Sequence, residues 1–266
     1  MDETTGARTF GGPAAGYDRF VGRYSGALAR ELADAADPRP GQRALDVGCG
    51  PGALTAELAA RLGVPHVAAV DPSPSFADTC RDRLPGVDVR VAAAENLPFA
   101  DADFDVTLAQ LVVNFMTDQQ AGVAEMVRVT HRGGSVGAAV WDYAGEMTLL
   151  RTFWDAAVAV DPAAATLDEG RRMQPSDAAS LGRLWTDAGL TDVRTSAAVV
   201  SAAYADFDDL WQPLETGVGP AGAHVAGLDP DRRGALRTEL RRRLDVGDAP
   251  FRLFARAWLA VGTVAR

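Results

Sequence analysis

Lysine is absent from this chain of 266 residues, so its 26 strongly basic side chains are all arginines. Without lysine the protein forms no lysine Schiff base, which excludes carbonyl chemistry of that kind. Positive charge is also in deficit, because the formal net charge is −10 at pH 7. A surface that binds nucleic acid needs clustered basic residues, so we expect no nucleic-acid partner.

Cysteine and histidine are rare as well. Cys49 and Cys80 are too few for a disulfide framework, and the three histidines (His66, His131 and His224) are widely separated along the chain. This spacing resembles no zinc-binding pattern. We therefore expect no metal site.

Long hydrophobic runs are missing too. No segment approaches the roughly eighteen consecutive apolar residues that a membrane helix needs. The first twenty residues, "MDETTGARTFGGPAAGYDRF", begin with acidic side chains and lack the apolar stretch of a secretory signal. We expect a cytoplasmic protein with no membrane partner.

Apolar runs alternate with helical patterns through the first half of the chain. Strands are expected at 43–48, 66–73, 87–93, from 104 onward and at 134–143, and helices at 25–36, 53–63, 74–84 and 118–130. Continuous apolar strands separated by helices indicate an α/β fold, in which helices cover both faces of a parallel sheet.

The pattern changes after residue 145. We expect helices at 147–160, 177–190 and 230–244, strands at 193–205 and 251–264, and a polar connection at 168–174. A helix containing Trp211, followed by a glycine-rich loop containing His224, is expected within 206–229. The run Arg241–Arg243 ends a helical pattern, where the helix dipole favours cations.

Three glycines stand at alternate positions in "ALDVGCGPGALTAELAARLG", residues 44–63. Gly48, Gly50 and Gly52 follow a buried strand and precede a helix. Glycine permits positive φ and leaves no Cβ between the backbone and a ligand. The carboxyl edge of a parallel sheet is where such folds bind ligands. A tight turn without a ligand remains the alternative.

Asp71 ends the second strand, nineteen residues after Gly52. At this place an acidic side chain faces a ligand bound at the first strand and accepts hydrogen bonds from a ribose diol. The ligand is then a dinucleotide or the adenosine of S-adenosylmethionine. The third glycine of the dinucleotide fingerprint is replaced by Ala53, which some variants tolerate, so the spacing leaves both open.

Four stretches together resemble one family: "LDVGCGPG", "AVDPS", "AAAENLPFADADFDV" and "EMVRVTHRGGSV". They look like the successive motifs of class I S-adenosylmethionine-dependent methyltransferases, in particular the small-molecule branch typified by ubiquinone/menaquinone methyltransferases. "YDRFVGRYS" is similar to the start of one bacterial subgroup. The resemblance covers roughly residues 13–145. It implies a Rossmann-like, mostly parallel seven-stranded sheet with helices on both faces and a helical substrate cap.

The resemblance also implies roles for individual residues toward the cofactor S-adenosylmethionine. The backbone around Gly48 and Gly50, with Cys49 between them, is expected to cradle the methionine portion, and Asp46 below it would hold the turn or the ligand's amino group. Gln110 would face the methionine end or the exit of the methyl group, and Tyr17 would come from the N-terminal helix that covers the cofactor. Arg23 either reaches the cofactor carboxylate or is a surface charge. Those expected at the adenosine are Asp71 on the ribose and Pro72, Ser73, Phe76, Ala94 and Glu95 around the adenine. The family often has Asp where this chain has Ala93, so either Glu95 or a backbone carbonyl would bind the adenine amino group, or the adenine would be held more loosely.

The resemblance implies methyl transfer to a small, apolar or aromatic molecule, by in-line displacement that depends mainly on positioning. No convincing general base stands out; His224 is more simply a surface histidine. A non-catalytic cofactor-binding protein is the alternative. A nicotinamide oxidoreductase is disfavoured because it would want a Tyr-x-x-x-Lys pair or an equivalent. A monomer or a homodimer is expected.

We expect one compact domain in two parts. Residues 1–145 would form an N-terminal lid, at 10–30, and the cofactor-binding core; residues 146–266 would complete the sheet and supply the cap. Two surplus blocks, 145–176 and 206–246, would carry a substrate pocket. The apolar residues expected to line it are Met147, Phe153, Trp154, Met173, Phe207, Trp211 and Leu214. A solid cap is the alternative.

Overall fold

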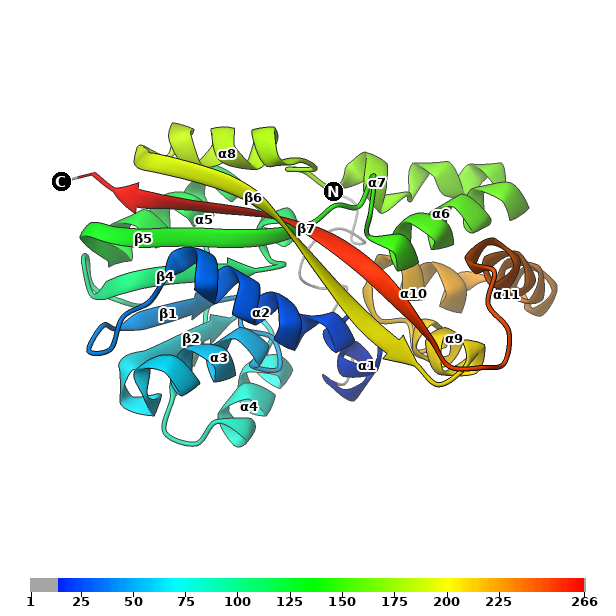
Figure 1. Cartoon of the computed structure of the whole chain (residues 1–266), viewed down its shortest axis with the longest axis horizontal. Helices are drawn as coiled ribbons and strands as arrows, with labels where there is room; N and C mark the ends of the chain where they lie inside the picture. Colours follow the sequence, from blue (N-terminus) through cyan, green and yellow to red (C-terminus); the bar gives the residue numbers. More distant parts are fainter. Residues whose placement is uncertain (1–13, 266) are drawn as a thin grey trace. The chain divides into compact units, whose positions relative to one another are not determined.

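The computed structural model of the protein describes residues 14–265. It contains a seven-stranded sheet in the order β3–β2–β1–β4–β5–β7–β6 (Figure 1). The strands are β1 (Ala44–Val47), β2 (Val67–Asp71), β3 (Asp88–Val91), β4 (Phe104–Gln110), β5 (Thr130–Trp141), β6 (Leu190–Tyr204) and β7 (Phe251–Val264). Strands β1 to β5 pair in parallel, and β7 is antiparallel to β5. The expected mostly parallel α/β sheet is confirmed.

Helices cover both faces of this sheet because its strands alternate their side chains between two apolar layers. On one face, Leu45 and Val47 share a core with α5 (Gln119–Val129) and α8 (Ala178–Asp187). On the other face, Asp46 is hydrogen-bonded to Thr55 of α3 (Ala53–Leu62). Helix α4 (Pro74–Arg83) packs beside α3, with the Cys80 thiol 3.7 Å from the Thr55 hydroxyl.

The chain divides into two compact units. The sheet unit comprises Ser25–Trp141, Gln174–Ala198 and the chain from Ala257. The helical unit comprises the described residues up to Tyr24, with Asp142–Met173 and Val199–Arg256. Helix α2 (Gly22–Ala36) contributes residues to both. The division expected at residue 145 stays a prediction, and residues 10–13 of the expected lid lie outside the described residues.

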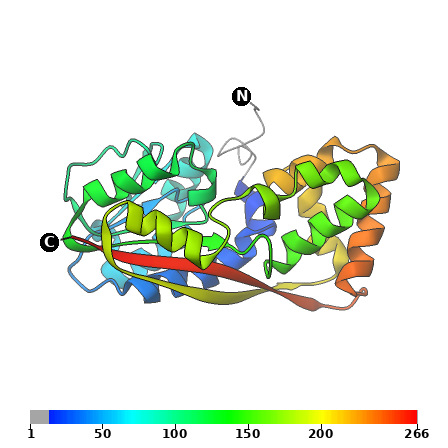
Figure 2. The same ribbon diagram turned by 90° about the horizontal axis from the view of Figure 1, so that it is seen from above.

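The helical unit is built around α6 (Thr148–Val160). Helices α10 (Gly219–Gly227) and α11 (Pro230–Leu244) lie beside α6, as Figure 2 shows, and α9 (Phe207–Glu215) packs on α10 and α1 (Ala14–Arg19). The seven apolar residues expected to line a pocket are all buried here. The rings of Phe207 and Trp211 stack with their centroids 6.4 Å apart. Whether these side chains enclose a pocket or form a solid cap stays a prediction.

The prediction of a glycine-rich loop after α9 is wrong, because this segment forms helix α10. Pro220 occupies the first turn, where its missing N–H costs nothing. A Cβ on Gly222 would lie 2.9 Å from the Gly217 carbonyl carbon and 3.2 Å from the Leu214 oxygen. Glycine therefore lets α10 approach the end of α9, and here it serves helix packing.

Two other segments differ from expectation. Strand β5 begins at Thr130, whereas the sequence predicted it to begin at 134, and its register with β4 shifts between the pairs Phe104–Thr130 and Val106–Ser135. The polar connection at 168–174 includes a short helix, α7 (Glu169–Arg172), whose Asp168 cap and first residue are buried. The expected basic end of helix α11 is confirmed. No helix in the described part of the chain is long and apolar enough to cross a membrane.

Candidate functional site

The turn after β1 is anchored on the neighbouring strand. The N–H groups of Gly48 and Cys49 both donate to the Val70 carbonyl of β2, at 2.7 and 2.9 Å. The three glycines have positive φ values of 72°, 52° and 98° at 48, 50 and 52. Such backbone is strained for residues with a Cβ, which explains why the chain uses glycine at all three positions.

The three glycines have different surroundings. A Cβ on Gly48 would lie 2.3 Å from Cγ2 of Val112, and one on Gly52 would lie 3.0 Å from the Cys80 sulfur. A Cβ on Gly50 would meet no protein atom within 4 Å. Gly48 and Gly52 are therefore explained by internal packing. Gly50 borders open space, which a bound molecule could occupy.

Asp71 connects the two loops at this edge of the sheet. Its carboxylate accepts hydrogen bonds from the Gly50 N–H and the Ser73 N–H, both at 2.8 Å. Burial raises the pKa of Asp71, and these two backbone donors oppose the rise. Each oxygen keeps acceptor capacity beyond its one backbone donor, so the expected ribose diol has acceptors to bind.

Asp46 lies beneath the glycine turn and is fully buried. Its Oδ2 accepts a hydrogen bond from the Thr55 hydroxyl at 2.6 Å, whereas Oδ1 has no partner among the described residues. Burial raises the pKa of Asp46 to about 7; the Thr55 hydrogen bond opposes this rise and the charge of Asp71 adds to it. The sequence did not indicate Thr55, because only the packing of α3 on β1 brings it to Asp46.

Gln110 is the last residue of β4 and lies close to Ser25 of α2 in the same unit. Its side-chain N–H donates to the Ser25 carbonyl at 3.1 Å. Gln110 Oε1 and Ser25 Oγ are buried without a hydrogen-bond partner among residues 14–265, as is Asp46 Oδ1. Leu111, the next residue, has a φ of +62°, which is unusual for a bulky side chain. Unpaired buried polar atoms and backbone strain both concentrate at functional sites.

The residues expected around the adenine lie on the loops after β2 and β3. Ser73 caps α4, Phe76 is buried on it and Pro72 is exposed. Ala94 is buried, and Glu95 accepts hydrogen bonds from the N–H groups of Thr117 and Asp118 at 2.6 and 3.1 Å. Glu95 therefore already joins the loop after β3 to the loop after β4. Their contact with adenine stays a prediction.

Tyr17 and Arg23 belong to the helical unit. The Arg23 guanidinium binds both oxygens of Asp209 and the Ala203 carbonyl, and it lies 4.9 Å from the centre of the Tyr204 ring. Arg23 also lowers the pKa of Asp209. The side chain thus has a structural role within its own unit, and its role toward a cofactor carboxylate stays a prediction, as does that of Tyr17.

His224 and the tryptophans are packed among other residues. His224, on α10, lies with its ring centroid 5.6 Å from that of Trp154, and burial lowers its pKa. Trp141, Trp154, Trp185 and Trp211 are buried. In the described chain, no group of three His, Cys, Asp or Glu side chains is arranged to hold a metal ion.

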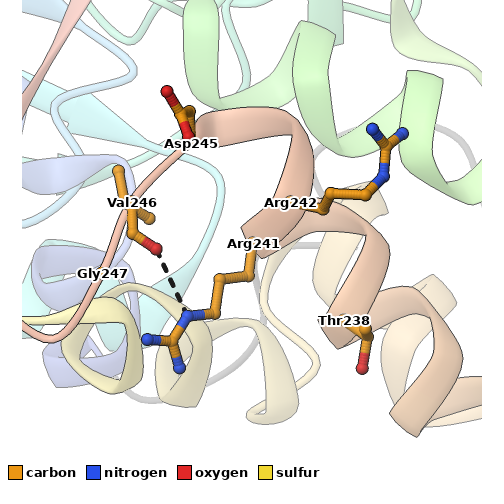
Figure 3. A pocket seen from close by; sticks show the side chains of 6 residues that line it. All are labelled: Thr238, Arg241, Arg242, Asp245, Val246 and Gly247. Atoms are coloured by element: carbon orange, nitrogen blue, oxygen red, sulfur yellow. Dashed lines mark hydrogen bonds between the residues drawn. The ribbon is translucent and has the colours of Figure 1, made fainter.

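A surface depression occurs at the end of α11, away from all of these residues in the sequence. It is lined by Thr238, Arg241, Arg242, Asp245, Val246 and Gly247 (Figure 3). The Arg241 Nε–H donates to the Val246 carbonyl at 3.3 Å, and the same guanidinium pairs with Asp248. Arg241 therefore binds the chain that follows the helix, and Arg242 pairs with Glu239 within α11. The depression contains none of the expected site residues.

The buried Asp46 gives a first testable prediction. The ordinary pKa of an aspartate is 3.8, whereas that of Asp46 in the folded protein is about 7, so the folded state binds the proton more tightly than the unfolded state. Its contribution to stability is present below about pH 4 and is lost as the pH rises toward 7. Asp46→Asn should therefore flatten the decline in the free energy of unfolding, measured in urea between pH 5 and 8. An unchanged decline would mean that Asp46 titrates normally.

Comparisons with known proteins give a matching family model and several curated relatives. Residues 45–137 match a family model described as a methyltransferase domain. The malonyl-[acyl-carrier protein] O-methyltransferase of Erwinia billingiae is 35% identical over 132 residues, which are 49% of this chain and 51% of that protein. The ubiquinone/menaquinone biosynthesis C-methyltransferase of Vibrio vulnificus is 35% identical over 139 residues, 48% of this chain and 54% of that protein.

The chain thus spans about half the length of the curated relatives that it matches. The solved structure of the YcgJ protein from Bacillus subtilis is similar over a larger share of this chain than the curated relatives are. It has a TM-score of 0.58 and 16% sequence identity, and the match covers 90% of this chain and 98% of that one. At this identity the likeness concerns the fold.

Proposed function

We propose that this protein is a class I S-adenosylmethionine-dependent methyltransferase, and that it transfers a methyl group from S-adenosylmethionine to a small molecule. The match of residues 45–137 to a methyltransferase domain and the similarity to curated methyltransferases support this. The fold is common to many activities, so methyl transfer is inferred from the residues of the site.

The fit of the cofactor is supported by an observation at the glycine turn. Gly50 has positive φ, no neighbour where a Cβ would stand, and an N–H fixed on Asp71. Beside it, the buried Oδ1 of Asp46 has no partner among the described residues. An open backbone face together with unpaired buried acceptors matches a ligand that carries an ammonium group and a ribose.

Different residues of the chain would bind different parts of this cofactor. Asp71 would accept the ribose hydroxyls, and the backbone at Gly48 and Gly50 would support the methionine portion. Gln110 Oε1 would accept a hydrogen bond from the polar methionine end. When bound, S-adenosylmethionine supplies a methyl group that its sulfonium already activates. The protein's main contribution is then to position the acceptor in line with that methyl group.

The substrate is proposed to be a small molecule with an apolar or aromatic part. This is supported by the composition of the helical unit, whose interior carries Phe153, Trp154, Phe207 and Trp211. Ligand sites are lined mainly by such side chains, with a few polar groups for orientation.

The proposal is tested first by thermal unfolding with S-adenosylmethionine, S-adenosylhomocysteine or NAD. A ligand that binds only the folded state stabilises it by about 2.7 kcal/mol at a hundred times its dissociation constant, which corresponds to several degrees in Tm. We expect both adenosyl ligands to raise Tm and NAD to leave it unchanged. A rise with NAD alone would indicate an oxidoreductase.

Binding alone does not separate an enzyme from a non-catalytic cofactor-binding protein. Incubation with S-adenosylmethionine labelled in its methyl group, together with a small-molecule extract, should move the label into extractable products. Transfer should disappear in Asp71→Ala. Tight binding with no transfer to any extract would favour the non-catalytic alternative.

A further inference from the structure

Two adjacent carboxylates of the helical unit are buried in different surroundings. Asp168 and Glu169, at the start of α7, are only 2% and 3% exposed. The two oxygens of Asp168 bind the two terminal nitrogens of Arg151 at 3.1 and 2.8 Å, and the Arg171 Nε lies 3.6 Å away. The charge of Asp168 is therefore balanced by arginine.

Glu169 has no such compensation within residues 14–265. Its carboxylate accepts one hydrogen bond there, from the indole N–H of Trp154 at 2.9 Å. Burial raises the pKa of Glu169 to about 7; the Trp154 N–H opposes the rise and the charge of Asp168 adds to it. Buried carboxylates are normally paired with a cation, and an ionised one accepts up to about four hydrogen bonds. Glu169 thus has unused capacity for a donor.

Aromatic rings surround the partner of this carboxylate. The Trp154 ring lies 5.6 Å from the His224 ring and 5.1 Å from the Phe153 ring, measured between centroids. Burial raises the pKa of Tyr143 and the charge of Glu169 adds to the rise, so this buried phenol is also an electrostatic neighbour. Aromatic faces attract organic cations, and the attraction grows when water is excluded.

Helix α7 is fixed in a way that keeps Glu169 in place. Asp168 caps it by accepting the Gly170 N–H at 2.9 Å while it binds Arg151. A Cβ on Gly170 would lie 2.3 Å from Arg151 Nη1 and 2.9 Å from the Tyr143 carbonyl oxygen. The backbone of α7 is thus pressed against Tyr143 and Arg151. Rigid support of this kind is typical of groups that bind a ligand.

We propose that Glu169 binds the protonated amine of an organic cation, whose apolar part packs against Trp154, Phe153 and His224. The inference rests on the proposed function, because it gives the small-molecule substrate a basic nitrogen. A metal ion would need further ligands, and the neighbouring carboxylate of Asp168 is already committed to Arg151. A single carboxylate with aromatic neighbours matches an alkylamine or an arylalkylamine.

The experiment compares phenethylamine with 2-phenylethanol, which has the same ring and a neutral polar group. At about 10 mM, phenethylamine should raise the Tm of the full-length protein by at least a few degrees, and the alcohol should have no effect. Glu169→Gln should weaken amine binding at least tenfold. The matched control is Glu146→Gln, an exposed carboxylate of the same unit that pairs with Arg256 and should leave binding unchanged.

A second measurement, made without any ligand, tests whether the Glu169 carboxylate lacks a cationic partner. At pH 8 Glu169→Gln should keep or raise Tm, because it removes a buried charge that no cation balances. Asp168→Asn should lower Tm, because it breaks the pair with Arg151. Equal destabilisation by both changes would make Glu169 structural and overturn the proposal.

Absence of amine protection, or equal protection by the alcohol, would also overturn it. S-adenosylhomocysteine is added to every variant in parallel. If it still raises Tm while the amine does not, the inference about Glu169 fails and the proposed methyl transfer stands. If neither ligand binds the wild-type protein, the proposed function fails as well.

Discussion

Asp71→Ala is expected to weaken the binding of S-adenosylhomocysteine by at least a hundredfold, as measured by calorimetry. Hydrogen bonds to a charged group contribute about 1.5–3 kcal/mol each, and the carboxylate is expected to accept two from the ribose. The change also removes the acceptor that fixes the N–H groups of Gly50 and Ser73. The turn around Gly50 would then lose one of its contacts with β2, which lowers affinity further, and keep those of Gly48 and Cys49 with the Val70 carbonyl.

A control is needed because part of this loss could come from general destabilisation. Asp177→Ala removes the side chain that caps α8 in the same unit, at a cost of about 1 kcal/mol. It leaves the loops after β1 and β2 intact and should bind S-adenosylhomocysteine as tightly as the wild-type protein. Unchanged affinity in Asp71→Ala would remove Asp71 from the site, and equal losses in both variants would assign the effect to stability.

The features that the sequence predicted well are local ones. The apolar runs at 43–48 and 66–73 are continuous because both faces of the strands are covered, and this pattern needs no knowledge of partners. Asp71 was identifiable from its place at the end of the second strand, and the glycine turn from its spacing. Each of these depends on a few neighbouring residues.

The features that it missed depend on packing between distant segments. Thr55 reaches Asp46 only because α3 lies on β1, and no sequence pattern indicated this hydrogen bond. Helix α10 was taken for a loop because glycines usually interrupt helices, whereas Gly222 permits close contact with the end of α9. Composition favours a loop there, and tertiary packing overrides it.

The carboxylate of Glu169 is a further case. Within "DEGRR" it reads as one charge in a polar connection, and burial was not foreseeable from the neighbouring residues. The hydrogen-bond partner of Glu169, Trp154, lies fifteen residues earlier, on α6, and only the fold brings the two together.

Two glycines of the same turn should respond differently to replacement by alanine. Gly48→Ala should be severely destabilising, because its Cβ would stand 2.3 Å from Val112 Cγ2 on backbone with a φ of +72°. Left-handed backbone costs about 1–2 kcal/mol and overpacking about 1–3 kcal/mol, so a loss of about 2–5 kcal/mol in the free energy of unfolding is expected. Adding Val112→Ala should recover the overpacking part and leave the backbone part.

Gly50→Ala should behave differently, although its backbone is also left-handed. The new methyl group meets no protein atom within 4 Å, so the free energy of unfolding should fall by only about 1–2 kcal/mol. The same methyl group would stand in the space assigned to the methionine portion, and the affinity for S-adenosylhomocysteine should fall at least tenfold. Gly133→Ala is the matched control, because it has a φ of +82° and equally open surroundings. It should share the loss of stability and keep the affinity. If Gly50→Ala also keeps the affinity, the open face at Gly50 belongs to a tight turn alone, and the cofactor is bound by other backbone.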